Sequence, residues 1–381
     1  MSLRVYFHKR QKGKIVRDCI SKIETLQLKG IAITIMMFHH CFLDSERYNG
    51  MSVVFTPFTE TSINKLAAFF KICVGMYVFL SAYGMTCSIR NYKFSDFEKN
   101  NRRYVSYLNH RFLRLLSGYW FIFFISSLLT IFIDATRFVS VYGKGRINAV
   151  IYYILDFLGI AHLTNTPTLC GTWWYMSLAL IIILLFPLLI ELYKHIGIYL
   201  ILFCMFVPLS LNYAIESKIP DIARWGGAVA IGICMAESNK WTKWHLSKNT
   251  LIEFITLSLG IICCFMIRKA SSTAKLIWIW DSIIPVYMIY YCWRFVLKYH
   301  WAKIFIPLGK HSMNIFLFHT FIRGIWWHRW VYSFKYFGLI TIMLLLVSLI
   351  VSILFEFIKE KTHWDERVIQ LFQCLGDLIK N

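Results

Sequence analysis

The sequence predicts an all-α fold, a polytopic transmembrane helix bundle of about ten spans with both termini in the cytoplasm. Of its 381 residues, 58% are hydrophobic and only 16% are charged, which is too apolar for a soluble domain of this length. Many of the 14 Trp and 21 Tyr stand near the ends of the apolar runs, where lipid headgroups would lie. The chain is therefore expected in the cell membrane, with lipids as its surroundings.

Ten segments meet the length of ~20 apolar residues that crosses a hydrocarbon core, or approach it with a flanking turn. They are 21–43, 66–86, 112–133, 172–192, 196–213, 222–236, 251–267, 276–297, 304–326 and 337–355. The segment 150–160 is also apolar, but it contains Asp156 and is too brief to span. This pattern predicts a surface or re-entrant helix there.

The distribution of Lys and Arg sets the predicted orientation. With the N-terminus inside, 26 of the 41 basic residues lie on the cytoplasmic side, 11 lie in external loops and 4 lie within spans. The expected organisation is a basic cytoplasmic segment (1–20), one membrane domain (21–358) and a cytoplasmic tail (359–381). Because orientation accounts for the formal charge of +21, nucleic acid is not expected as a partner.

Few local motifs point to a bound cofactor. The 11 cysteines are scattered without spacing suited to zinc, so buried thiols that pack as small hydrophobes are expected. No phosphate-binding loop, dinucleotide fingerprint or Gly-x-Ser-x-Gly elbow is evident. We expect no metal and no permanently bound cofactor.

The first span carries three ionisable side chains on defined faces. Ser21 and Glu24 fit a capping box, which predicts that the helix begins there. Lys29 and His40 are eleven residues apart, so they lie about 20° apart around the helix and ~16 Å along it, whereas His39 points about 80° to the other side. Either Lys29 snorkels and the histidines are structural, or the face that Lys29 shares with His40 is functional.

A basic cluster precedes the third span. Arg111 and Arg114 are three residues apart, so both can project from one side of a helix, and their guanidinium groups suit phosphate oxygens. The alternative is an ordinary positive-inside signal. The other members of the cluster are Arg102, Arg103 and His110.

The span 304–326 contains a polar stripe on an otherwise apolar helix. Ser312 and His319 are seven residues apart, about 20° from alignment, and Arg323 follows one turn later. Such a stripe must face the protein interior or a wet cavity. Its polar groups either form part of a catalytic pocket or make hydrogen bonds to a neighbouring helix. Its other polar residues are Lys310, His311 and Asn314.

Two smaller patterns do not indicate a function alone. FLSAYG (79–84) contains small residues that suit close helix packing, and TWWYMS (172–177) suits an interfacial aromatic belt.

Taken in order, these segments resemble the acyltransferase-three family of integral membrane acyltransferases, which includes bacterial enzymes that O-acetylate surface polysaccharides. LKGIAITIMMFHH (28–40) is similar to the first-helix pattern of a basic residue, ten residues and a histidine, with Lys29 in place of the more usual Arg. FLSAYG, HRFLRLL (110–116) and LGKHSMNIFLFH (308–319) are similar to its second-helix, RxxR and late-helix motifs. Ala179 stands where many relatives carry a glutamate, so no role is carried over for that carboxylate, and the fused extracytoplasmic domain of some relatives is not expected.

The resemblance implies transfer of an acetyl or other short acyl group from acyl-CoA to a hydroxyl of a surface or lipid-linked glycan. His40 would be the general base or acyl carrier, with His319 and His39 as further catalytic candidates. Arg111, Arg114 and Lys29 would hold the donor. Candidate substrate contacts are Ser81, Tyr83, Trp174, Ser312 and Arg323.

Other functions remain open on the sequence. A transporter or flippase also carries polar intramembrane residues, although no two-fold repeat or pair of corresponding broken helices is detectable. Within the enzyme class, the alternative acceptors are a small molecule or an amine.

Overall fold

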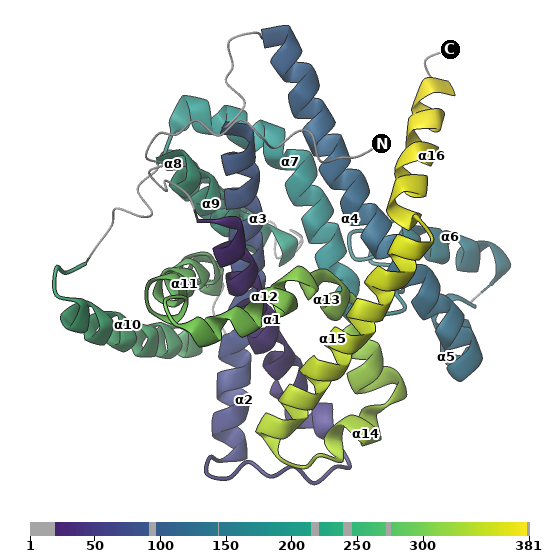
Figure 1. The fold of residues 1–381 in the computed structure, drawn as a ribbon, viewed down its shortest axis with the longest axis horizontal. Coiled ribbons are helices and arrows are strands. Elements are labelled where there is room, and N and C mark those ends of the chain that lie inside the picture. The colour runs from purple at the N-terminus through teal and green to yellow at the C-terminus, as the bar shows by residue number, and fades with distance from the viewer. Residues whose placement is uncertain are drawn as a thin grey trace.

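The computed structural model describes residues 20–90, 97–143, 145–214, 221–238, 246–271 and 276–378, so most of the segment 1–20 lies outside it. The described residues form helices and no strand; the only strand-like pairing among them is an isolated bridge between Val54 and Tyr336. Figure 1 shows α1 in the middle of the bundle, with α10 at one edge and α5 and α6 at the opposite edge. The all-α prediction is confirmed.

The helices are α1 (Lys22–Phe42), α2 (Glu60–Phe69), α3 (Cys73–Arg90), α4 (Phe97–Ile133), α5 (Ala135–Tyr142), α6 (Arg146–Phe157), α7 (Trp174–Ile196), α8 (Tyr199–Ala214), α9 (Gly226–Ser238), α10 (Thr250–Ala270), α11 (Ile277–Tyr291), α12 (Phe305–Lys310), α13 (Ser312–Thr320), α14 (His328–Tyr332), α15 (Phe337–Lys361) and α16 (Trp364–Leu378). Each of the ten predicted spans falls on one or more of them. The segment 150–160 falls on α6, whose 12 residues are too few to cross a bilayer.

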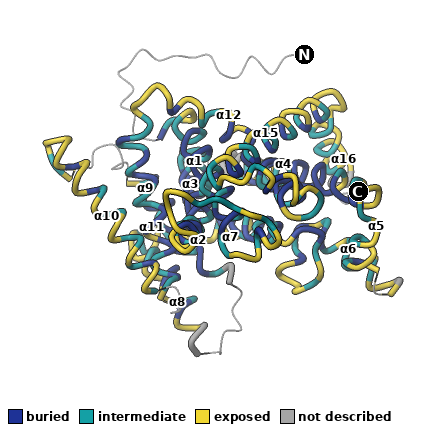
Figure 2. Tube along the Cα trace, turned by 90° about the horizontal axis from the view of Figure 1, so that it is seen from below, coloured by how far each residue is buried: buried dark blue, intermediate teal, exposed yellow. Residues whose placement is uncertain are grey.

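Five stretches of the described chain are long and apolar enough to span a membrane: Glu60–Arg90, Tyr104–Ile133, Gly171–Ile196, Thr250–Ala270 and Phe337–Lys361. In Thr250–Ala270, only 11% of the most apolar window is buried inside the protein, so α10 turns its side chains outward as lipid contact requires. Figure 2 shows this outer helix mostly exposed and the central helices mostly buried. The number of ten spans and the orientation stay predictions.

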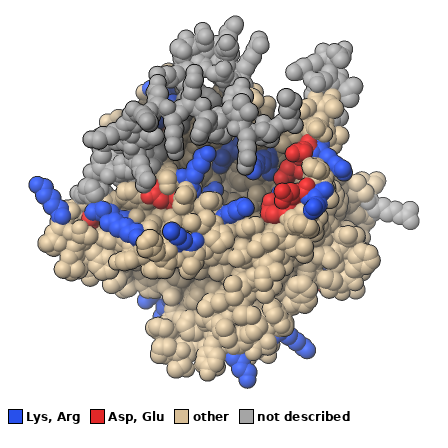
Figure 3. All heavy atoms as spheres, viewed as in Figure 1, with Lys and Arg blue, Asp and Glu red and all other residues tan. Residues whose placement is uncertain are grey.

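Basic side chains are concentrated on one side of the visible surface. In Figure 3 most of the visible Lys and Arg lie in a band across the upper part of the described surface, and a few extend from the lower end. The positive-inside rule relates such an asymmetry to orientation in the membrane, which stays a prediction.

The predicted start of α1 is present. Ser21 accepts from the Glu24 amide at 3.2 Å, and the Glu24 carboxylate accepts from the Ser21 amide at 2.7 Å, which completes the capping box. Glu24 also accepts from the Trp293 indole at 3.1 Å. The first helix is therefore fixed at its beginning as well as packed along its length.

The predicted span 304–326 is not one helix. His311 has φ −94° and ψ 3°, which ends α12 and turns the chain into α13, and a π-helical turn (Phe321–Trp326) follows α13. Ser312 and His319 both remain on α13, but Arg323 lies on the π-helical turn, so the stripe of three does not follow regular helix geometry.

Helices α1 and α12 cross in close contact because two glycines face the crossing. A Cβ added at Gly30 would lie 2.1 Å from the Phe305 carbonyl oxygen, and one added at Gly309 would lie 1.8 Å from the Leu26 carbonyl oxygen. A side chain fits at neither position. By contrast, a Cβ at Gly84 would meet nothing within 4 Å, and the close contact of α3 with α9 involves Ala82 and Gly232.

Candidate active site

Two histidines from distant parts of the chain meet in the bundle. The rings of His40 on α1 and His319 on α13 have centroids 4.9 Å apart at an interplanar angle of 45°. His319 is fully buried, whereas His40 is partly exposed. Nδ1 of His40 is buried without a hydrogen-bond partner among the described residues, so the accessible part of this side chain is not Nδ1.

His39 points to a different neighbour. Its Nδ1 lies 2.7 Å from the carbonyl oxygen of Ala67 on α2. Because a carbonyl can only accept, Nδ1 of His39 carries the proton and donates it. The two adjacent histidines therefore separate in direction, with only His40 facing α13, as the helix geometry predicts.

Backbone contacts set the tautomer of His319. Its Nδ1 lies 2.7 Å from the Phe316 carbonyl oxygen and 3.2 Å from that of Ile315, so Nδ1 donates. In the neutral ring, Nε2 then presents its lone pair, 3.3 Å from the Thr320 hydroxyl. His319 is held in an orientation from which it can accept a proton.

Arg323 is a buried cation beside this pair. It is 5% exposed, and its Nε has no hydrogen-bond partner among the described residues. Its charge acts on both His40 and His319, and its guanidinium interacts with the Tyr332 hydroxyl. A buried guanidinium is costly to desolvate, and a negative charge bound or formed nearby would offset that cost.

The donor-binding candidates gather at the other end of α1. Lys29 and Arg111 are both half-buried, and they lie close enough that their charges repel. Arg114 and His110 are exposed. The two arginines of the RxxR segment therefore lie in different surroundings, Arg111 half-buried and Arg114 at the surface. The side chains of Arg102 and Arg103 lie outside the described residues.

A series of aromatic ring contacts joins the Lys29 end of α1 to His319. The Tyr77 and Tyr175 rings are 6.4 Å apart, Tyr175 is 5.3 Å from Phe316, and Phe316 is 6.1 Å from His319. Tyr77 donates to the Lys29 carbonyl oxygen at 2.9 Å. These rings therefore form a series of contacts, here called the aromatic path, that runs from beside the Lys29 backbone to His319.

The remaining predicted contacts are dispersed. Ser312 donates to the Gly309 carbonyl at 2.9 Å and interacts with Tyr77, which places it on the path. Ser81 is half-buried one turn after Tyr77 on α3. Tyr83 instead accepts from the Ile20 amide at 3.2 Å, at the start of α1 and away from the histidines. Trp174 lies at the start of α7, where it lines a separate pocket.

The family model for an acyltransferase domain matches residues 27–358. The chain belongs to the acyltransferase-three family. The match begins two residues before Lys29, ends within α15 and includes every site residue that the sequence predicts. No curated protein and no solved structure matches this membrane acyltransferase.

Sequence reasoning assigned no role in the site to several polar groups of this acyltransferase. Thr320 joins His319 to Thr172, whose hydroxyl lies 3.3 Å from that of Thr320. Asp156 is 1% exposed, and burial raises the pKa of its carboxyl even though four hydrogen bonds act in the opposite direction. The sequence showed Asp156 as an acid within an apolar segment and Thr172 as part of TWWYMS, but neither was assigned a role in the site; Thr320 offered no signal.

Proposed function

We propose that this protein is a membrane-bound O-acyltransferase that moves an acetyl or other short acyl group from cytoplasmic acyl-CoA to a hydroxyl of a cell-surface or lipid-linked glycan. The observation that carries the proposal is the contact of His40 with His319 at one end of an aromatic path, with Lys29 and Arg111 at the other. Family membership supports acyl transfer. The hydroxyl acceptor and the CoA donor are part of the proposal.

The donor is proposed to bind with its phosphates at the basic end of α1. Arg111 and Lys29 would provide charge and hydrogen-bond donors, and Arg114 would contribute from the exposed side. The pantetheine arm would follow the rings of Tyr77, Tyr175 and Phe316 toward His40. Lys29 lies ~16 Å from His40 along α1, with Arg111 beside it. This separation suits acyl-CoA, whose phosphates and thioester are far apart.

His40 is the proposed general base, acting through Nε2 because its Nδ1 is buried. The acceptor oxygen attacks the thioester carbonyl carbon as Nε2 takes the hydroxyl proton. The new bond between the acceptor oxygen and the acyl carbon is kept, while the C–S bond of the thioester breaks. The proton passes from Nε2 to the departing sulfur, and the products are an ester and free CoA. If His40 is instead the acyl carrier, Nε2 attacks first and releases the CoA thiol before the hydroxyl attacks.

Arg323 has a proposed role in the same step. Attack on the thioester places negative charge on the carbonyl oxygen, and a buried guanidinium stabilises such a charge more than a solvated one does. His319 would orient His40 or the acceptor, and His39, bound to Ala67, would hold the helix against α2.

The test uses purified full-length protein and radiolabelled acetyl-CoA. We expect release of free CoA that depends on a glycan acceptor, with the label recovered as an alkali-labile ester on that glycan. Comparing surface-glycan acetylation in cells with and without the chain identifies the acceptor. A protein that moves a solute across vesicles without consuming acetyl-CoA would be a transporter, and label recovered as an amide would indicate an amine acceptor.

A further inference from the structure

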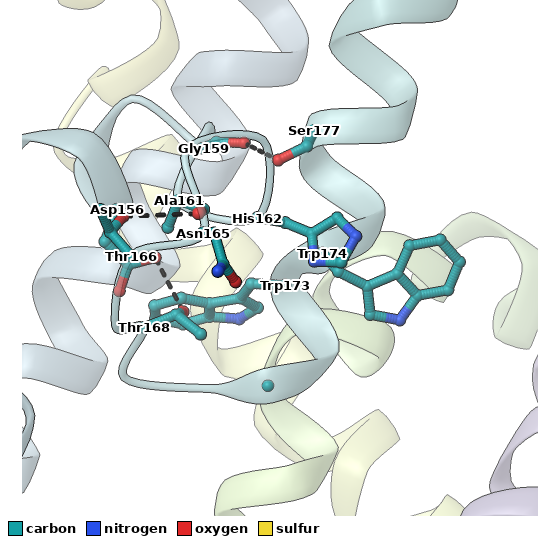
Figure 4. Close-up of a pocket in the computed structure, with 11 residues that line it drawn as sticks. Asp156, Gly159, Ala161, His162, Asn165, Thr166, Thr168, Trp173, Trp174 and Ser177 are labelled. Atoms are coloured by element: carbon teal, nitrogen blue, oxygen red, sulfur yellow. Dashed lines mark hydrogen bonds between the residues drawn. The ribbon is translucent and has the colours of Figure 1, made fainter. Parts of the chain in front are cut away.

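A pocket beside the histidine pair has no part in the function proposed above. It lies between the loop that follows α6 and the beginning of α7, has a volume of about 80 Å³ and opens to the surface. Figure 4 shows the indoles of Trp173 and Trp174, the ring of His162 and the amide of Asn165 around it. Trp174 is partly exposed and Trp173 is buried, so one indole face is accessible and the other forms part of the wall.

The pocket is preformed because Asp156 fixes its loop. The Asp156 carboxylate accepts from the Leu169 amide and the Thr168 hydroxyl, both at 2.8 Å, and from the Tyr142 hydroxyl at 2.5 Å. On the opposite wall, Ser177 donates to the Gly159 carbonyl at 2.6 Å. A pocket held in this way needs little reorganisation to receive a ligand.

The pocket lies next to His319. Trp173, which lines it, donates to the Leu317 carbonyl on α13 at 2.9 Å. Thr172 and Thr320 form a second connection, with 3.3 Å between their hydroxyls and 3.3 Å from Thr320 to Nε2 of His319. Both distances are long for hydrogen bonds that involve a hydroxyl, so these contacts leave the groups able to bond to a ligand instead.

The lining selects for a neutral, hydroxyl-rich ring. Indole faces offer flat apolar surface for the C–H face of a sugar, and the Asn165 amide and Thr166 hydroxyl offer donors and acceptors at the rim. Asp156 is the only acid among the described residues that line the pocket, and its carboxylate already accepts from four donors, of which the Tyr119 hydroxyl, at 3.5 Å, is the fourth. A charged amine would therefore find no available carboxylate there.

We propose that this pocket binds a neutral sugar unit of the acceptor and presents its hydroxyl toward Thr172, Thr320 and His319. This inference rests on the proposed function and deepens it, since it specifies a neutral sugar and a site on α7 and the loop before it. Trp174 and Asn165 are the side chains that determine acceptor binding. Neither lies on the path proposed for the donor.

The test measures binding and transfer separately in the full-length protein. The probes are a panel of methyl glycosides of neutral hexoses, with a 2-amino sugar as the charged comparison. Binding is followed by ligand-observed NMR for the wild type, Trp174→Ala, Asn165→Ala and Trp330→Ala, the last being an exposed indole outside the pocket. We expect Trp174→Ala to weaken glycoside binding and raise the acceptor KM about tenfold, the loss of one stacking contact, while acetyl-CoA binding stays unchanged.

The outcomes separate this inference from the proposed function. If no neutral glycoside binds, if the amino sugar binds more tightly, or if Trp174→Ala and Trp330→Ala behave alike, the assignment of the pocket is wrong. If glycosides bind in a manner that requires Trp174 but acetyl-CoA is not consumed, the pocket is a sugar site and the proposed acyl transfer is wrong.

Discussion

His40 and His319 lie with ring centroids 4.9 Å apart, although α1 and α13 come from opposite ends of the sequence. Only His40 of the two neighbouring first-helix histidines makes this contact, because His39 is bound to Ala67 on α2. The contact brings two ionisable rings from distant segments together at one place in the bundle.

Replacing the two first-helix histidines should give unequal results. His40→Ala should lower kcat by ~10²–10⁴-fold, the usual contribution of a general base, while acetyl-CoA binding is retained. His39→Ala should lose the Ala67 contact and some thermal stability but keep most of the activity. Steady-state kinetics and donor titration check both variants, and an active His40→Ala with an inactive His39→Ala would move the catalytic assignment by one residue.

The two arginines of the RxxR segment should also differ. Arg111 is half-buried beside Lys29, whereas Arg114 is exposed, so Arg111→Ala should raise the acetyl-CoA KM more than Arg114→Ala. Arg111→Lys should rescue only partly because it keeps the charge and loses the planar fork. If the double Ala variant keeps the same acetyl-CoA KM, the two arginines do not bind the donor and serve only as cytoplasmic charges that orient the spans.

Arg323 should affect the chemical step rather than donor binding. Arg323→Met should lower kcat by about 10²-fold, the scale of losing one oxyanion contact, with little change in the acetyl-CoA dissociation constant. The matched control is Arg329→Met, which removes an exposed cation from the following helix. Equal effects of the two substitutions on kcat would exclude the proposed role of Arg323.

The crossing of α1 with α12 should not tolerate a methyl group. Gly309→Ala places its Cβ against the Leu26 carbonyl, and overpacking of this kind costs about 1–3 kcal/mol. The midpoint of thermal unfolding in detergent should therefore fall. Gly84→Ala, at a helical position with open space, should leave the midpoint unchanged or raise it, and a similar fall in both variants would show that the crossing is not the cause.

The orientation predicted from Lys and Arg can be tested by labelling. Single cysteines at Asn49 and Asn101, in a background without reactive thiols, should react with a membrane-impermeant reagent from opposite sides. Labelling of both positions from the same side would overturn the assignment of the termini to the cytoplasm.

Local sequence patterns were sufficient for the features that depend on a single helix. The capping box at Ser21 and Glu24 and the different directions of His39 and His40 follow from helix geometry, and the structure contains them. The break at His311 was not predicted, because a hydropathy pattern includes the polar residues Lys310, His311 and Ser312 in an otherwise apolar span without showing that a helix ends among them.

Features that join distant segments could not be derived from periodicity. The unequal surroundings of Arg111 and Arg114 depend on where α1 and α7 lie against α4, and the pocket beside Trp174 depends on a loop held by Asp156. A hydrophobic pattern specifies which face of a helix is buried, but it does not specify which other helix covers that face.

The glycine crossing of α1 with α12 has a consequence for how the protein is made. The ribosome releases α1 long before α12 and α13 exist, so Gly30 and His40 leave the ribosome without the helices that later cover them. During that interval Lys29 and the histidines are polar groups without their final neighbours, which is costly in lipid. Docking of α12 and α13 onto α1 is thus among the last events of assembly, and a nascent chain gains its histidine pair only when synthesis is almost complete.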